Sequence, residues 1–200
     1  IGRCPDVGPA STLSNINVMN AGARANLALV PATGDAGTCA FTLSEANVIV
    51  DELGTLTADA GYGWSLAPPR RVADTRQCTA DWCSGKPGAG GVVRVPLGTT
   101  APAAAVAITV TEAGAAGYVT VGPCDDIRAG AGERTSNVNF AKNATVTGLA
   151  VVSVEDGEVC AYTRSPVHVV IDVQAELTTE QTVGLLPVAP ARAHDSRDAG

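Results

Sequence analysis

The sequence predicts an all-β protein built from tandem antiparallel β-sandwich or barrel-like domains that disulfides stabilise. Short runs rich in Val and Thr alternate with turns, and the 200 residues include 22 Gly and 12 Pro. This pattern is typical of strands joined by turns. The six cysteines indicate a disulfide framework. Large blocks of sequence also recur at a fixed spacing, which indicates repeated domains.

The recurring blocks are spaced by 120 to 122 residues. The pattern R-x-x-D-[S/T]-R starts at Arg71 and again at Arg192, and the run A-N-V-I-V-D-E matches V-H-V-V-I-D-V, which aligns Asp51 with Asp172. A period of this size corresponds to a domain rather than to one coil of a solenoid. We therefore expect the C-terminal half of one repeat at 1–61, a complete repeat at 62–182 and the start of a further repeat at 183–200.

Eight runs of the complete repeat read as strands, separated by the turn signals K-P-G-A-G-G, E-A-G-A-A-G, E-D-G-E and R-S-P. A helix is the alternative for the Ala-rich run at 101–107, but Pro102 and the Val-Ala-Ile-Thr-Val alternation favour a strand. Eight or nine short strands at this spacing predict an antiparallel sandwich or barrel. The expected strands are 70–76, 91–97, 104–113, 117–124, 136–141, 147–155, 158–164 and 167–177.

The cysteines divide into three pairs when the repeat is taken into account. Two pairs have nearly equal spacing, and each begins in a C-x-D turn and ends in a C-A-[F/Y]-T strand. The remaining two cysteines close the small loop C-T-A-D-W-C. Zinc ligation is the alternative, but structural zinc sites favour close-spaced ligand pairs, which this chain lacks. The predicted disulfides are Cys4–Cys39, Cys78–Cys83 and Cys124–Cys160.

Composition limits the partners and the compartment. A formal net charge of −7 argues against a nucleic-acid partner. The longest apolar run, at 101–110, is shorter than the roughly 20 residues that a membrane-spanning helix needs. Three disulfides point to an extracellular or cell-surface location. The chain begins I-G-R-C-P-D, without Met or a signal-peptide pattern, so we expect a mature product or an excised segment.

Recurring polar residues are the candidate site. Asp172 lies among aliphatic residues and should need an arginine partner, for which Arg71 and Arg76 are the candidates. On an extended strand, Asp74 shares a face with Arg76, and Asn137 shares one with Asn139. One hypothesis is a structural network that fixes strand ends, and the other is a calcium or glycan site formed by Asp74, Asn137, Asn139 and Asp172. The repeat adds the counterparts Asn15, Asn17 and Asp51.

No catalytic site is predicted, and no cofactor. The run His194-Asp195-Ser196 contains triad residue types, but neighbours on a strand alternate between faces. Its counterpart in the complete repeat has Ala73 in place of the histidine. We therefore expect a non-enzymatic protein. Trp82 in the small disulfide loop is the candidate ligand contact, and its alternative role is to fold back over the sandwich.

These motifs resemble a tandem repeat of secreted and cell-wall proteins of actinobacteria. The similarity rests on R-x-x-D-[T/S]-R, the runs A-A-V-A-I-T-V-T and G-Y-V-T-V-G-P-C, and then S-N-V-N-F, V-C-A-Y-T and H-V-V-I-D-V-Q, in this order over essentially the whole chain. The chain departs from the family's R-L-L-D-T-R form with R-V-A-D-T-R and R-A-H-D-S-R. The Cys78–Cys83 loop is a second departure. The resemblance implies an accessory module without catalytic residues.

The expected function is structural. We expect a non-catalytic repeat of an extracellular bacterial protein that forms a stalk, surface coat or filament-like array, with neighbouring copies of the repeat as partners. Unfinished β-domains leave open edges that another strand can fill, so self-assembly is expected. The alternatives are a cell-wall glycan-binding module accessory to a secreted hydrolase and a phage fibre or decoration protein.

Overall fold

The structure is a computed structural model, and it describes residues 1–4, 7–9, 24–28, 37–58, 63–78, 82–179 and 183–198. Two of the candidate residues, Asn15 and Asn17, lie outside the described residues. Among the described residues the strands are antiparallel, which agrees with the predicted all-β class. They form two four-stranded sheets and two two-stranded ones.

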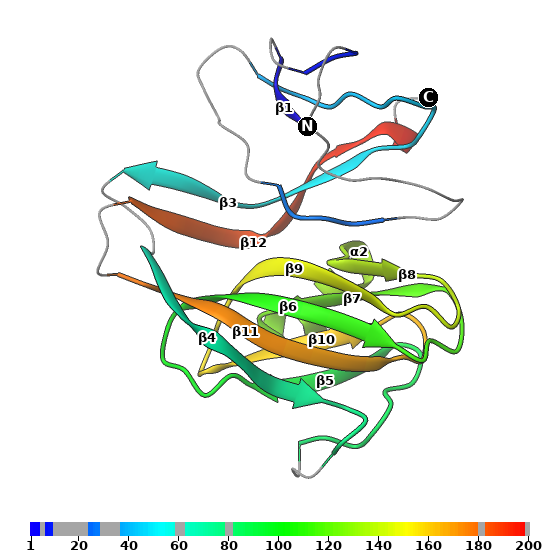
Figure 1. Cartoon of the computed structure of the whole chain (residues 1–200), viewed down its shortest axis with the longest axis vertical. Helices are drawn as coiled ribbons and strands as arrows, with labels where there is room; N and C mark the ends of the chain where they lie inside the picture. Colours follow the sequence, from blue (N-terminus) through cyan, green and yellow to red (C-terminus); the bar gives the residue numbers. More distant parts are fainter. Residues whose placement is uncertain are drawn as a thin grey trace.

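The two four-stranded sheets pack face to face as a β-sandwich within residues 63–179 (Figure 1). One sheet has the order β4-β11-β6-β9, with bounds β4 Gly63–Asp74, β11 His168–Thr178, β6 Ala103–Thr111 and β9 Val146–Ser153. The other has the order β5-β10-β7-β8, with bounds β5 Gly91–Pro96, β10 Glu158–Thr163, β7 Gly117–Gly122 and β8 Val138–Phe140. The strands thus follow the runs predicted from the sequence, and the Ala-rich run is strand β6.

The core of the sandwich comes from alternate residues of both sheets. Ile108 of β6 and Ile171 of β11 face Val121 of β7 and Val159 of β10, and all four side chains are fully or almost fully buried. Burying an aliphatic side chain of this size stabilises the fold by about 1.5–3 kcal/mol. The period-2 pattern therefore fixes which face of each strand turns inward, and it leaves Asp172 and its alternate neighbours on the outer face.

A short helical segment lies between β7 and β8, where the sequence analysis predicted no helix and extended the preceding strand to Cys124. It comprises α1 Cys124–Asp126, η3 Ile127–Ala131 and α2 Gly132–Arg134. Its first residue, Cys124, forms a disulfide with Cys160 of β10. Ile127 and Tyr162 pack beside this disulfide in a small buried cluster. The helical segment thus covers part of the outer face of β7 and β10.

A separate two-stranded ribbon is formed by β3 (Ile49–Ala58) and β12 (Val183–Asp195), which ends in the short helix η4 (Ser196–Asp198). Figure 1 places this ribbon beside the sandwich, and β12 contacts β4 and β9. Arg192 of β12 donates from Nη2 to the carbonyl of Arg134 at 2.8 Å. Strands β1 (Gly2–Arg3) and β2 (Thr38–Cys39) form a second small ribbon, which the Cys4–Cys39 disulfide joins.

The three disulfides of the structure join the same pairs that the sequence predicts, Cys4–Cys39, Cys78–Cys83 and Cys124–Cys160. Such a set is typical of an oxidising, extracellular-type environment. No helix in the described ranges has the length and apolar character that crossing a membrane requires.

Candidate functional site

The candidate site begins with an ion pair between Arg71 on β4 and Asp172 on β11, which lie opposite each other in the ladder. The guanidinium donates from Nε to Oδ1 at 2.8 Å and from Nη2 to Oδ2 at 3.1 Å. This bidentate geometry is the strong form of the Arg–carboxylate pair. The hydrogen bond to Asp172 raises the pKa of Arg71. The partner that the sequence requires for Asp172 is therefore Arg71.

A β-bulge explains the spacing of the R-x-x-D motif. Ala73 pairs with Ile171 and Arg71 pairs with Asp172, so Val72 is an extra residue in β4. In a regular strand, residues three apart point to opposite faces. The bulge changes the phase by one residue and brings Arg71 to the side of Asp74, with Nη1 and Oδ2 3.7 Å apart. Asp74 thereby becomes a second carboxylate beside Arg71.

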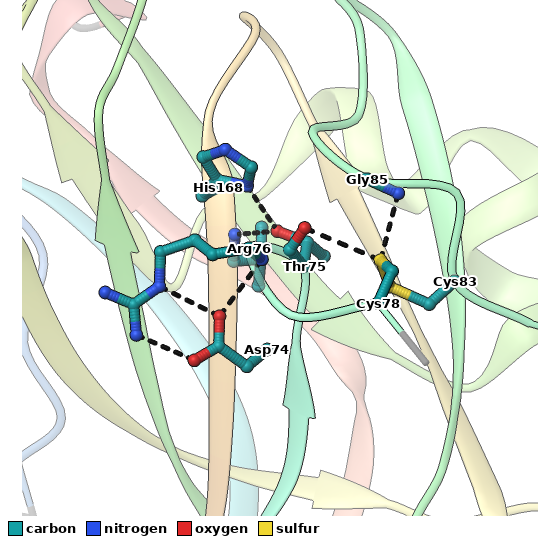
Figure 2. Close-up of a disulfide and its surroundings, with 8 residues drawn as sticks. Asp74, Thr75, Arg76, Cys78, Cys83, Gly85 and His168 are labelled. Atoms are coloured by element: carbon teal, nitrogen blue, oxygen red, sulfur yellow. Dashed lines mark hydrogen bonds and ion pairs between the residues drawn. A yellow bond between two sulfur atoms is a disulfide. The ribbon is translucent and has the colours of Figure 1, made fainter. Parts of the chain in front are cut away.

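Asp74 and Arg76 close the turn that follows β4. Arg76 donates to the carboxylate of Asp74 through its side chain, with Nη2 2.7 Å from Oδ2, and through its backbone N–H at 3.0 Å (Figure 2). The side chain of Asp74 is only 8% exposed. The hydrogen bond from the Arg76 side chain is the main reason that the pKa of Asp74 is lowered. The carboxylate is therefore ionised and fully engaged by arginines.

Thr75, between these two residues, joins the end of β4 to β11. Its buried hydroxyl accepts the backbone N–H of Val169 at 2.9 Å, and its own N–H donates to the carbonyl of Val169 at 3.0 Å. The same hydroxyl lies 3.0 Å from Nδ1 of His168, as Figure 2 shows. While it accepts from Val169, the hydroxyl can also donate its own proton to His168 Nδ1, and in that arrangement the histidine ring is neutral. Burial lowers the pKa of His168, in keeping with that state.

The second hexapeptide, 192–197, makes the corresponding contacts with β3. Arg192 donates from Nε to Oδ1 of Asp51, and its Nη1 lies 2.9 Å from Oδ2 of Asp195. Arg197 donates to Asp195 from its backbone N–H at 3.0 Å and from Nε at 2.8 Å. Its hydrogen bond is the main reason that the pKa of Asp195 is lowered. The arginine–aspartate arrangement of the sandwich thus recurs in the β3-β12 ribbon.

The serine of the second hexapeptide takes the place of Thr75. Ser196 accepts the N–H of Val48 at 2.8 Å, and its own N–H donates to the carbonyl of Val48 at 2.9 Å. Its Oγ lies 3.5 Å from Oδ1 of Asn47, at the position that His168 occupies in the sandwich. A hydroxyl is therefore used in both copies to connect the motif to the neighbouring strand, which accounts for the Ser/Thr choice.

The structure does not bring Asn137 and Asn139 to this network. Asn137 caps the end of β7, where its Oδ1 accepts the N–H of Val121 at 2.6 Å, and Asn139 donates to Ser136 Oγ at 3.1 Å. Asn139 points away from the core on the β5-β10-β7-β8 sheet, whereas Asp172 points away from it on the other sheet. The four residues of the calcium or glycan hypothesis therefore lie on opposite faces of the sandwich and do not form one site.

Trp82 is half-buried and packs against the core, which is the role that the sequence analysis gave as its alternative. It also borders a depression of about 200 Å³. Arg71, Asp74 and Gln77 line the same depression, together with the Cys78–Cys83 disulfide. The two candidates found separately in the sequence, the polar motif and the tryptophan, thus meet at this depression.

Sequence reasoning missed two contributors to this end of the sandwich. Arg70 donates from Nη1 to the carbonyl of Leu97 at 2.6 Å and from Nη2 to Glu176 at 3.3 Å. Arg70 has Ala191 as its counterpart in the second hexapeptide region, so the repeat gave no signal for it. Thr75 was visible in the motif, but its hydroxyl contact to β11 required the register of the strands.

The described residues contain no group of three or more His, Cys, Asp or Glu side chains that could hold a metal ion. The chemistry that the site does provide is ion pairing and hydrogen bonding between strands. In comparisons with known proteins, no protein-family model, no curated protein and no solved structure matches this chain.

Proposed function

We propose that the chain is a non-catalytic structural repeat of an extracellular bacterial protein, and that its units assemble into a stalk, coat or filament-like array. The observation that carries the proposal is the use of each R-x-x-D-[S/T]-R motif. In both copies the guanidinium and hydroxyl groups bind carboxylates and backbone groups of the adjacent strand. Residues engaged in this way stabilise strand pairing and offer no free nucleophile or base.

The exposed side chains of the first unit support assembly with neighbouring copies. Phe41 is 40% exposed, whereas Tyr162, its counterpart in the sandwich, is 5% exposed. Ile49 is 42% exposed, and its counterpart Val170 is 2% exposed. Two positions that are buried in the sandwich are therefore exposed in residues 37–58 of this chain. Covering such apolar surface favours association, because its removal from water contributes about 25 cal/mol per Å².

Sedimentation velocity over a concentration series tests the proposal. We expect residues 1–200 to form oligomers that grow with concentration. The double variant Phe41→Ser/Ile49→Ser should shift the distribution toward monomer. Val92→Ser is the matched control, because Val92 is 44% exposed on β5 of the complete sandwich. A chain that stays monomeric at all concentrations contradicts assembly.

The second candidate function is recognition of cell-wall glycan, and the depression beside Trp82 is the observation that favours it. An indole face next to guanidinium, carboxylate and amide groups offers both stacking and hydrogen bonding to a sugar. Co-sedimentation with purified peptidoglycan tests this function. Retention that is lost in both Trp82→Ala and the exposed-site variant Gln77→Ala would support it. Failure of the unmodified chain to co-sediment rules it out.

A further inference from the structure

We propose that β12 is an exchangeable strand, and that the β12 of one chain pairs with the β3 of a second copy in the same register that it uses within its own chain. This inference rests on the proposed function, because it names the contact by which copies join. The partner is a second copy of this chain, and the interaction surface is the pairing edge of β3.

The two strand pairs, β4–β11 and β12–β3, share one pairing pattern. On β4, Val72 is the extra residue between Arg71 and Ala73, and on β12 the extra residue is Ala193, because Arg192 pairs with Asp51 and His194 pairs with Val50. Each pair has a second register shift at the same place, on the N-terminal side of the arginine. In β4 this shift spans 67–69, and in β12 it spans 188–190.

Contacts of the same kind also hold both strand pairs together. Each has a guanidinium bound to the carboxylate of the facing strand, an aspartate that binds the arginine two positions later, and a hydroxyl that accepts a backbone N–H of the facing strand. A slip of one residue turns each side chain of the strand to the other face of the sheet, so it would separate the guanidinium from the carboxylate. The edge of β3 is therefore selective for a strand with this motif, and β12 carries one whichever chain it belongs to.

The connection to β12 lies close to the start of β4. Strand β11 ends at Thr178, where it pairs with Gly63, and β12 begins at Val183, where it pairs with Ala58. On both strands, only a few residues separate the end of the β4–β11 ladder from the start of the β3–β12 ladder. The chain therefore leaves the sandwich toward β12 next to the place where it enters β4. In the sequence, residues 179–182 connect β11 to β12. When β12 is transferred to another chain, its ladder, the Arg192–Asp51 pair and the Ser196–Val48 bonds can form again on the β3 of that chain.

The stoichiometry favours a second copy as the partner. Each chain offers one donor strand, β12, and one acceptor strand, β3. The remaining strand with the motif, β4, is already paired with β11 inside the sandwich. Donation from one chain to the next is a head-to-tail contact, which generates open filaments or closed rings. Exchange breaks the interactions of β12 with its own sandwich, such as the 2.8 Å hydrogen bond from Arg192 to the carbonyl of Arg134.

A mixing experiment with single-cysteine variants tests the exchange. Glu52 and Ala191 pair directly between β3 and β12, and both are exposed. All six native cysteines are in disulfides, so an introduced cysteine supplies the free thiol. Chains carrying Glu52→Cys and chains carrying Ala191→Cys are mixed, incubated at high concentration and oxidised. We expect covalent heterodimers in at least several-fold excess over the two homodimers.

The control replaces Glu52→Cys with Lys142→Cys, an exposed thiol in the turn between β8 and β9. Collision alone cross-links this pair as readily as the paired positions. A Glu52–Ala191 heterodimer yield no greater than that of the control overturns the exchange.

The double variant Glu52→Cys/Ala191→Cys separates this inference from the proposed function. Oxidised at low concentration, it locks β12 to the β3 of its own chain. We expect the locked chain to lose concentration-dependent association and the reduced chain to keep it. A locked chain that still assembles would show that copies join elsewhere, which overturns the exchange and leaves the array intact. If the unmodified chain does not associate at all, the array itself fails.

Discussion

Arg71 and Asp172 face each other across β4 and β11, and the guanidinium binds the carboxylate through two hydrogen bonds of 2.8 and 3.1 Å. The bulge at Val72 places Arg71 opposite Asp172 in the ladder, and it also brings Arg71 to the same side as Asp74. The guanidinium thus lies between two carboxylates from neighbouring strands. The same relationship joins Arg192 to Asp51 in the β3-β12 ribbon.

Removal of this arginine should weaken the sandwich. In Arg71→Ala, Asp172 loses its bidentate partner, and its side chain is only 21% exposed. The Arg71 side chain is 54% exposed, so solvent screening limits the effect. We expect a decrease of about 1 kcal/mol in the free energy of unfolding, measured by urea denaturation. Arg128→Ala is the control, because its pair with Asp125 is exposed and 3.5 Å long. An equal decrease in both variants would contradict a special role for Arg71.

The hydroxyl of Thr75 should contribute more to the stability of the folded chain than its methyl group does. In Thr75→Val, a buried backbone N–H of Val169 loses its acceptor, which costs about 1–3 kcal/mol. Thr75→Ser keeps the hydroxyl, and Ser196 fills this role in the second hexapeptide. We therefore expect the serine variant to stay within about 1 kcal/mol of the original chain in denaturation experiments. The prediction fails if valine is tolerated as well as serine.

The carboxylate of Asp74 should contribute to acid sensitivity. The pKa of Asp74 is lowered in the folded chain, chiefly by the hydrogen bond from Arg76. Its stabilising contribution is therefore complete above the ordinary carboxyl pKa of about 4 and is lost as the pH falls through the lower folded value. In Asp74→Asn, we expect lower stability at neutral pH and a shallower decline as the pH falls below about 4. Asp125→Asn, at a side chain that is 90% exposed, should keep the original acid profile.

Much of the fold could be predicted from the sequence because it depends on local pattern. Alternation of apolar residues located the strands, and matched blocks located the disulfides. The helical segment at 124–134 was not predicted, because each of its helical elements is only a few residues long. Its position depends on packing around the Cys124–Cys160 disulfide, which is a tertiary contact. Local propensity carries little information about such a segment.

The site was predictable by residue type and less so by geometry. The sequence predicted an arginine partner for Asp172, which lies among aliphatic residues, and Arg71 was one of the two candidates. Period-2 reasoning placed Asp74 with Arg76 correctly, but it could not place Arg71 beside Asp74, because their separation is odd and the bulge lies between them. The asparagines were grouped with the aspartates by chemistry, whereas the sheet order places them on the opposite face. The missing information in both cases was strand register.

The last prediction concerns His168, which is neutral when it accepts from Thr75. Burial lowers the pKa of His168 in the folded chain below its ordinary value of about 6.5. Between the folded and unfolded values the unfolded chain binds more protons, so stability should decrease as the pH falls below about 6.5. Groups around the ring include Glu112, with Oε2 3.7 Å from Nε2, and also Lys86, Arg76 and Asp74.

The variant His168→Asn tests this dependence, because Asn47 occupies the corresponding position beside Ser196. An asparagine side chain can accept from Thr75 and does not titrate. We expect the variant to lose the decrease in stability just below about pH 6.5. Denaturation midpoints measured from about pH 8 to about pH 5 give the comparison, and His194→Asn serves as the control because His194 is exposed. If the His168 variant and the original chain follow the same curve over this range, the histidine does not titrate in the way that its contacts require.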